Sequence, residues 1–177
     1  MIVALMIGRT GSSGFPGKNV KKVLGKALCE YPLIASKKSK YVDKLFVSTD
    51  CPIISKLSKK YGAILLKRPK HLATKKALGE EVFRDGYFKI KKLLQAQNYT
   101  IELLVLLMAN APTITGTLID KGIKILKKDH TIDSAVTTSI YNMWSPLRAR
   151  KLDRKKMLKP FVPFETFGNP KTLNCDR

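Results

Sequence analysis

A glycine-rich loop directly after a short apolar run constrains this chain more than any other feature. Residues 2–6 (Ile-Val-Ala-Leu-Met) have the length and the side chains of a buried strand, and residues 7–19 then supply four glycines together with Arg9 and Lys18. Glycines let the backbone curl so that successive N–H groups face one anion, and the two cations add charge where a triphosphate needs it. The loop therefore indicates a phosphate-binding cradle, with a plain strand-to-helix turn as the alternative.

The loop matches neither of the two best-known nucleotide-binding motifs. It does not end in Gly-Lys-Ser/Thr, as a P-loop does, and it lacks the Gly-x-Gly-x-x-Gly spacing of dinucleotide-binding folds. The kind of nucleotide must therefore be inferred from the rest of the chain.

Size and composition indicate a single globular domain. The chain has 177 residues, of which 44% are hydrophobic, enough for a sizeable core. No apolar run approaches the roughly 20 residues that cross a bilayer, and the N-terminus lacks the pattern of a signal peptide. Cys29, Cys51 and Cys175 have no metal-ligand spacing, so reduced thiols are expected. We expect a cytoplasmic protein with no membrane partner.

A net charge of +21 leaves two interpretations of the surface open. Lysine pairs are spread along the chain, which favours a solvated lysine-rich surface and small anionic ligands. Contact with a polyanion such as nucleic acid is the alternative. The sequence shows no interleaving of aromatic and basic residues of the kind that forms a stacking platform. Nucleic acid is therefore not expected as the main partner, although the charge does not exclude it.

Apolar patterning predicts alternating strands and helices. The predicted strands span residues 2–6, 44–48, 63–66, 103–108 and 134–138, and the predicted helices span 28–39, 53–61, 78–96 and 117–128. This order predicts a three-layer α/β fold with a mostly parallel sheet and helices on both faces.

In such folds ligands bind at the carboxyl ends of the strands. The glycine loop, residues 48–50 and residues 110–112 all fall there. After about residue 140 the chain becomes rich in proline and aromatic residues without helical periodicity, which predicts an irregular arm over 140–170.

Five short segments carry a family resemblance. They are Pro-Gly-Lys-Asn at 16–19, Leu-Gly-Lys-Ala-Leu at 24–28, Val-Ser-Thr-Asp at 47–50, Tyr-Gly-Ala at 61–63 and Arg-Pro-x-x-Leu-Ala at 68–73. In order and spacing the chain resembles, over about residues 2–140, the acylneuraminate (CMP-sialic acid) cytidylyltransferases and related sugar-acid CMP synthetases. The resemblance implies a nucleotide-diphospho-sugar transferase-like fold. It also implies transfer of CMP from CTP to a sugar acid with release of pyrophosphate and help from Mg²⁺, in a homodimer whose interface includes the arm.

The resemblance and the residue chemistry together define a candidate site. Arg9 and Lys18 are expected to hold the phosphates and to act in catalysis. The expected nucleotide-binding set is Gly8, Arg9, Gly11, Ser12, Gly14, Lys18, Asn19 and Arg68; the expected substrate contacts are Asn110, Arg148 and Arg150; and the expected metal ligand is Asp176.

For two of the polar residues at strand ends, a purely structural role is the alternative to a functional one. Arg68, which precedes a proline, would in that case be no more than an exposed strand end. Asp50 would cap the helix that begins at Pro52, an interpretation we favour over metal binding.

The chain also departs from the family pattern. Ser13 stands where the family usually has a lysine, and residues 108–114 lack the family's glutamine and arginine. The chain stops at Arg177, so we expect a single nucleotidyltransferase domain that lacks its C-terminal elements. The rival functions are a sugar-1-phosphate nucleotidyltransferase or glycosyltransferase-like enzyme, and a non-catalytic relative that binds nucleotides or nucleic acid.

Overall fold

The computed structural model describes residues 1–11, 15–138, 150–155 and 157–161. The chain divides into two compact units, Met1–Val136 and Thr137–Arg177. Within the second unit, β7 (Arg150–Leu152) and β8 (Leu158–Pro160) form an antiparallel hairpin. Most of the irregular arm predicted over 140–170 lies outside the described residues, but its described part contains this hairpin, so the prediction of no regular structure is wrong there. That the two units work as one domain stays a prediction.

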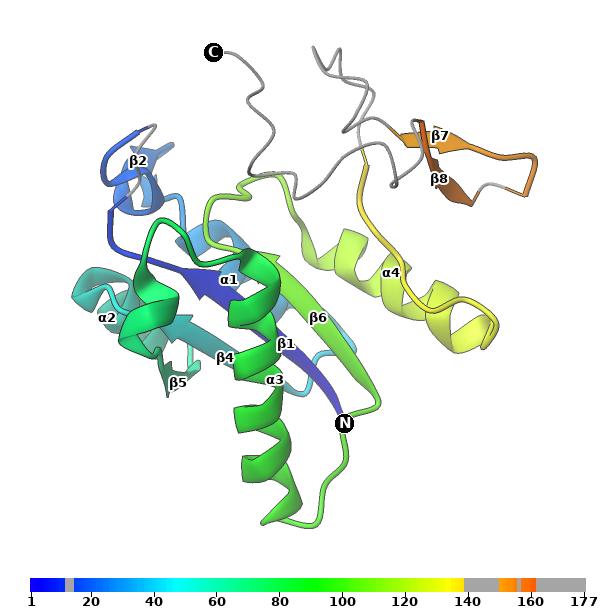
Figure 1. The fold of residues 1–177 in the computed structure, drawn as a ribbon, viewed down its shortest axis with the longest axis horizontal. Helices are drawn as coiled ribbons and strands as arrows, with labels where there is room; N and C mark the ends of the chain where they lie inside the picture. The colour runs from blue at the N-terminus through cyan, green and yellow to red at the C-terminus, as the bar shows by residue number, and fades with distance from the viewer. Residues whose placement is uncertain (12–14, 139–149, 156, 162–177) are drawn as a thin grey trace. The chain divides into compact units, whose positions relative to one another are not determined.

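The first unit is built on a four-stranded parallel sheet (Figure 1). Its strands lie in the order β5-β4-β1-β6 and span, in chain order, β1 (Ile2–Gly8), β4 (Lys44–Thr49), β5 (Ile64–Lys67) and β6 (Leu103–Met108). The ladder sets Gly8 opposite Thr49 and Thr49 opposite Lys67. The carboxyl ends of the strands are therefore level with one another.

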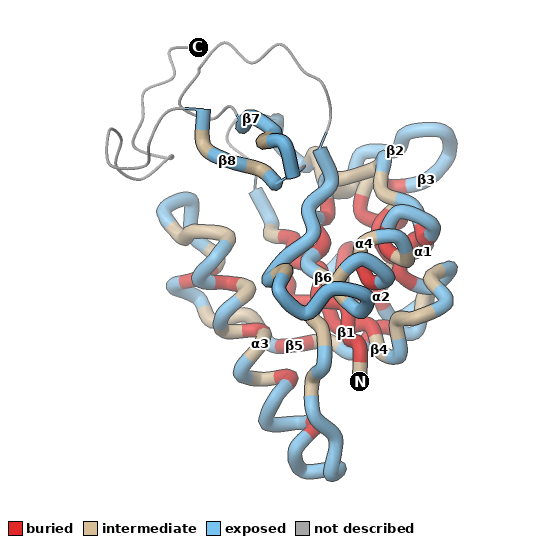
Figure 2. The backbone as a smooth tube through the Cα atoms, turned by 90° about the vertical axis from the view of Figure 1, so that its right-hand side faces the viewer, coloured by how far each residue is buried: buried red, intermediate tan, exposed pale blue. Residues whose placement is uncertain are grey.

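Helices cover both faces of this sheet. They are α1 (Glu30–Lys38), α2 (Pro52–Lys60), α3 (Gly79–Gln95) and α4 (Gly116–Lys128). Because side chains alternate along a strand, Val3, Leu5 and Ile7 of β1 pack with α3, whereas Ile2, Ala4 and Met6 pack with the other three helices. Figure 2 shows the buried residues concentrated on the central strands. The predicted three-layer α/β fold is confirmed.

Two glycines allow unusually close packing between elements. A Cβ added at Gly86 of α3 would lie 2.5 Å from Cδ2 of Leu5, and one at Gly116 of α4 would lie 2.9 Å from the carbonyl carbon of Lys38. The absence of a side chain at these positions therefore lets α3 approach β1 and lets α4 approach the end of α1.

The predicted boundaries of α2, residues 53 and 61, are confirmed to within one residue. Pro52 occupies its first turn, where a missing N–H leaves no hydrogen bond unmade. At the other end Gly62 adopts a φ of 78°, and the N–H groups of Gly62 and Ala63 donate to the carbonyls of Lys59 and Ser58. These are the two bonds of a Schellman motif, which needs a left-handed residue after the helix.

The strand predicted over 134–138 is wrong. In the described part of this segment the backbone forms no regular structure, and Val136 is 69% exposed. Apolar and β-branched residues form a strand only when a neighbouring strand accepts their hydrogen bonds, and no described strand pairs with this segment.

Four short elements of the first unit were not predicted. Two are 3₁₀ turns, η1 (Lys18–Val20) and η2 (Lys70–Ala73), and two are the strands β2 (Lys22–Val23) and β3 (Lys26–Ala27) of a small hairpin. The hairpin turns through Leu24 and Gly25, both with positive φ. Leu24 is an unusual residue there, because such turns favour Asn or Asp before the glycine. No helix in the described ranges combines the length and apolar character of a membrane span.

A buried carboxylate joins the start of α1 to the end of α2. Glu30 accepts hydrogen bonds from the backbone N–H of Ala27 (2.7 Å) and from the hydroxyl of Tyr61 (2.8 Å). Burial alone would raise the pKa of Glu30, but these two bonds and nearby lysines outweigh it and hold that pKa below its usual value. Burial and the bond to Glu30 raise the pKa of Tyr61 to about 12.

Replacing Tyr61 with Phe should remove one of the two partners of this carboxylate. Hydrogen bonds to charged groups contribute roughly 1.5–3 kcal/mol, and we expect a loss of that size in the free energy of unfolding at pH 7. A lowered folded-state pKa contributes stability above the unfolded-state value that is lost as pH falls through the folded-state value. The deficit of the variant should therefore shrink in acid.

Urea unfolding at pH 7 and at about pH 3 would measure the effect. Tyr41→Phe is the matched control, because the ring of Tyr41 lies under the Lys124 ammonium and, within the described residues, its hydroxyl has no partner. Equal losses in the two variants would contradict the role given to Glu30.

Candidate functional site

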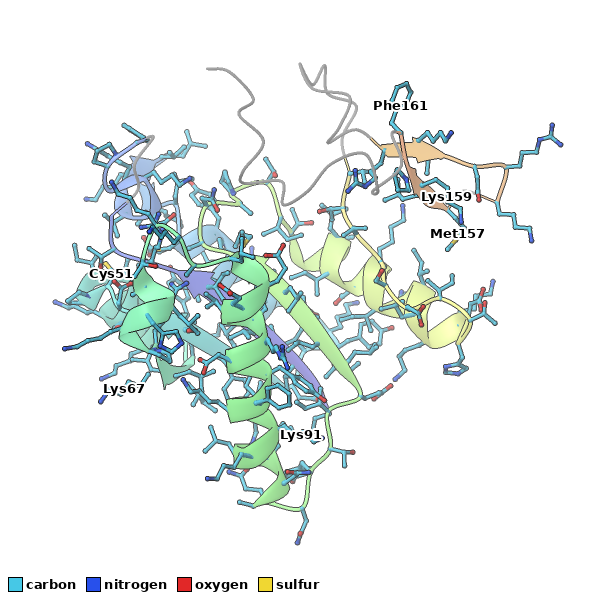
Figure 3. All side chains as sticks on the ribbon, viewed as in Figure 1. Cys51, Lys67, Lys91, Met157, Lys159 and Phe161 are labelled. Carbon is cyan, nitrogen blue, oxygen red and sulfur yellow. The ribbon has the colours of Figure 1, made fainter. Side chains whose placement is uncertain are left out.

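The candidate site lies where the four parallel strands end. Arg9 follows β1, Asp50 follows β4, Arg68 follows β5, and Asn110 lies just beyond β6. Neighbouring strands lie about 4.8 Å apart, so the sheet order brings these four residues into one row although they are distant in the sequence. Figure 3 labels Cys51 and Lys67, the immediate chain neighbours of Asp50 and Arg68.

Two side chains hold the peptide group that joins Arg9 to Thr10. The side-chain amide of Asn19 donates to the carbonyl of Arg9 (3.2 Å), and the Oδ1 atom of Asp50 accepts the N–H of Thr10 (2.8 Å). Both polar atoms of one peptide group are therefore bonded, one to the far end of the loop and the other to the adjacent strand. The start of the loop is fixed in orientation by protein groups alone.

The interpretation of Asp50 as the cap of α2 is wrong. The N-cap residue of that helix is Cys51, and it makes no side-chain capping bond. The N–H of Cys51 instead donates to Oγ1 of Thr49 (3.0 Å), while Asp50 reaches across to the glycine loop. The sequence pattern missed this partner because Thr10 becomes a neighbour of Asp50 only when β1 and β4 pair.

The glycines at the described loop positions are favoured for different structural reasons. A Cβ at Gly8 would lie 2.7 Å from Cβ of Ala109 and 3.1 Å from Cδ1 of Ile54, so this position allows close packing between β1, α2 and the end of β6. Gly11 and Gly17 adopt φ values of 72° and 69°, in the left-handed region that favours glycine. Ser12 and Gly14 lie outside the described residues. Lys18, half-buried, opens η1.

Arg68 is half-buried, so the interpretation of it as an exposed strand end is wrong. Its Nε donates to the carbonyl of Leu72 (3.1 Å), whereas its Nη1 is buried and has no hydrogen-bond partner among the described residues. Burial lowers the pKa of Arg68; the carboxylate of Asp50 opposes this, and the nearby guanidinium of Arg9 lowers it further. A buried donor without a partner, next to a second cation, is typical of an anion-binding site.

The expected substrate and metal residues fall in different parts of the chain. Asn110 is exposed in the turn after β6, and Arg150 is exposed in β7 of the second unit. Arg148 and Asp176 lie outside the described residues. Over the described ranges, no group of three or more His, Cys, Asp or Glu side chains could hold a metal ion.

A family model described as cytidylyltransferase matches residues 3–154, which includes every strand end of the candidate site. The chain belongs to the cytidylyltransferase family. This confirms the resemblance that the five sequence segments indicated.

Curated relatives of this cytidylyltransferase-family chain include two proteins from Campylobacter. It is 32% identical over 112 residues to post-translational flagellin modification protein B of Campylobacter coli, covering 63% of this chain and 46% of that protein. It is 30% identical over 112 residues to CMP-N,N'-diacetyllegionaminic acid synthase of Campylobacter jejuni, with the same coverage of 63% and 46%. The match to N-acylneuraminate cytidylyltransferase of Escherichia coli is 34% identical over 85 residues and covers 48% of this chain and 20% of that protein. The chain thus spans less than half the length of each.

Two solved structures share the fold. One is CMP:2-keto-3-deoxy-manno-octonic acid synthetase complexed with CTP, with a TM-score of 0.54, 17% identity, and coverage of 74% of this chain and 49% of that one. The other is a cytidylyltransferase from Leptospira borgpetersenii, with a TM-score of 0.52, 20% identity, and coverage of 72% and 49%. Both confirm that the cytidylyltransferase-family chain has the α/β fold predicted for it.

Proposed function

We propose that this chain binds CTP at the carboxyl ends of its strands and transfers CMP to a sugar acid of the sialic or legionaminic acid type. The observation that carries the proposal is the neighbouring guanidinium groups of Arg9 and Arg68 beside the start of the glycine loop. Nη1 of Arg68 is buried and has no partner among the described residues, and Asp50 and Asn19 hold the first peptide of the loop. Family membership supports CTP as the nucleotide. The printed names of the relatives support a sugar acid as the acceptor.

In the proposed reaction a hydroxyl of the sugar acid attacks the α-phosphorus of CTP. A new P–O bond to the sugar forms as the P–O bond to pyrophosphate breaks, and the hydroxyl proton is lost to the surroundings. Phosphoryl transfer asks a protein mainly to align the reactants and to neutralise charge. Arg9, Lys18 and Arg68 would hold the phosphate oxygens, and the loop backbone would fix their position. Asn110, Arg148 and Arg150 are the proposed contacts of the sugar acid.

The proposed Mg²⁺ would accompany the triphosphate and neutralise part of its charge. Mg²⁺ in such sites is usually bound through one or two carboxylates together with substrate phosphates. We propose Asp176 as one such carboxylate. Because the described residues form no ligand cluster, no step of the mechanism is assigned to the ion.

We further propose a cytoplasmic homodimer in which residues 140–170 contribute to the interface or to the substrate pocket. The proposal rests on the family resemblance. Light scattering of the purified chain should give twice the chain mass of 19.8 kDa. A monomeric mass at the concentrations used for assays would contradict it.

Isothermal titration with each of the four nucleoside triphosphates, in the presence of Mg²⁺, tests the proposed function. We expect CTP to bind more tightly than UTP, GTP or ATP. A preference for UTP or ATP would favour a sugar-1-phosphate nucleotidyltransferase, and a folded chain that binds none of the four would contradict the proposal.

A second assay tests the acceptor. Pyrophosphate release should require both CTP and a sugar acid, measured on this chain and on a version extended at its C-terminus. Tight, steeply salt-dependent binding to RNA without pyrophosphate release from either version would instead support a non-catalytic nucleic-acid-binding relative.

A further inference from the structure

We propose that Asp50 is a positioning residue for the nucleotide: its carboxylate, acting together with Asn19, orients the Arg9–Thr10 peptide so that the glycine loop meets the phosphates of CTP. The proposal deepens the proposed function and rests on it. In this role Asp50 neither contacts the nucleotide nor takes part in the chemistry. It acts through the loop.

The geometry of the peptide group carries this inference. A single peptide group has one donor and one acceptor, and here Asp50 takes the donor at 2.8 Å while Asn19 supplies a donor to the acceptor at 3.2 Å. With both ends bonded, rotation of this peptide would break two hydrogen bonds at once. The side chain of Arg9 is attached directly next to this peptide group. Its approach to the phosphates therefore depends on the two bonds.

The two hydrogen bonds that Asp50 and Asn19 make to the Arg9–Thr10 peptide, here called the clamp, also determine which loop atoms remain available to a ligand. The N–H of Thr10 points to Asp50 and cannot donate to a phosphate while that bond is made. Backbone donors for the phosphates must therefore come from other residues. Gly11, the next residue, already turns away in the left-handed region at a φ of 72°.

Electrostatics alone would not favour a carboxylate at this place. A negative charge beside a triphosphate site repels the ligand and by itself weakens binding. A carboxylate at this position therefore needs another role to favour binding. Asp50 does neutralise part of the charge of Arg68, whose guanidinium lies close enough to respond to it. When the carboxylate is removed, a positioning role thus predicts weaker CTP binding, whereas the loss of repulsion alone predicts tighter binding. An experiment can therefore separate the two roles.

Two substitutions of Asp50 make the separation. Asp50→Asn keeps an oxygen that accepts the Thr10 N–H and removes the negative charge, so a positioning role predicts CTP binding equal to or tighter than that of the unchanged chain. Asp50→Ala removes both the charge and the acceptor. We expect it to weaken CTP binding about 5- to 20-fold, the range that loss of an exposed hydrogen bond to a charged group supports.

Asp43 provides a matched control. Its Oδ2 accepts the backbone N–H of Ile2 at 2.8 Å, so it makes the same kind of bond at the same length. This bond lies at the amino ends of the strands, the opposite edge of the sheet from the glycine loop. Asp43→Ala should leave CTP binding within about twofold of the unchanged chain, since this edge is remote from the glycine loop.

The experiment is titration of CTP with Mg²⁺ into the unchanged chain and into Asp50→Ala, Asp50→Asn and Asp43→Ala. Weaker binding by Asp50→Ala with retained binding by Asp50→Asn supports the positioning role. Binding by Asp50→Ala that equals or exceeds that of the unchanged chain would overturn it, as would equal weakening in both Asp50 variants.

Amide hydrogen exchange of the protein without nucleotide keeps this test apart from the proposed function. Asp50→Ala should raise exchange at Thr10 at least tenfold relative to Asp50→Asn, with the sheet core unchanged in both. If the unchanged chain does not bind CTP, the proposed function fails while the exchange result still decides whether Asp50 holds the loop. Unchanged exchange in Asp50→Ala would refute the clamp.

Discussion

Alanine in place of Arg9 is expected to weaken CTP binding by about 10- to 100-fold. A charge-assisted hydrogen bond to phosphate contributes roughly 1.5–3 kcal/mol, and each 1.4 kcal/mol is a factor of ten in affinity. Arg9 follows the buried strand β1 directly, and its peptide is fixed by Asp50 and Asn19. Little ordering of the backbone is therefore required when the nucleotide binds, so most of the lost interaction should appear in the measured affinity.

Arg84→Ala is the matched control for this prediction. Arg84 is exposed on α3, with its guanidinium above the ring of Phe88, so its removal also lowers the net charge by one. Isothermal titration should find CTP binding within about twofold of the unchanged chain for Arg84→Ala. Equal weakening by the two substitutions would show that Arg9 contributes only general charge, which would contradict its assignment to the nucleotide site.

Alanine at Gly116 is expected to lower the free energy of unfolding by about 1–3 kcal/mol, the usual range for overpacking. Its Cβ would lie 2.9 Å from the carbonyl carbon of Lys38, 3.0 Å from the oxygen of the same carbonyl and 3.1 Å from the carbonyl oxygen of Ala35. These are backbone atoms, which cannot rotate away as a side chain can. The first turn of α4 would have to move away from the end of α1.

Alanine at Gly122, in the same helix, is expected to have the opposite effect. The nearest atom to its added Cβ is Cβ of Ala135 at 3.7 Å, an ordinary contact distance. Since alanine is favoured over glycine inside a helix by about 0.8–1 kcal/mol, the free energy of unfolding should rise by up to that amount. Urea denaturation of the two variants would compare them, and a change of the same sign in both would contradict the packing assigned to Gly116.

Much of the architecture could be predicted from local patterns. The apolar runs at 2–6 and 103–108 became the strands β1 and β6, and Pro52 and Gly62 marked both ends of α2. Signals of this kind depend on a few neighbouring residues and on the burial of one face, so they survive in the folded chain. The segment 134–138 has the same local signal but no described strand beside it, and it forms none.

The chain's sequence by itself determined the order of strands and helices, the glycine loop and the family to which the chain belongs. Each of these depends on residues close together in the chain or on motifs in a fixed order. Only the tertiary structure decided that Asp50 holds Thr10 rather than capping α2, and that the guanidinium of Arg68 is partly buried near that of Arg9. These contacts join residues some 40 to 60 positions apart. They follow from the pairing of β1 with β4 and of β4 with β5, which long-range hydrogen bonding and burial select and no local pattern encodes.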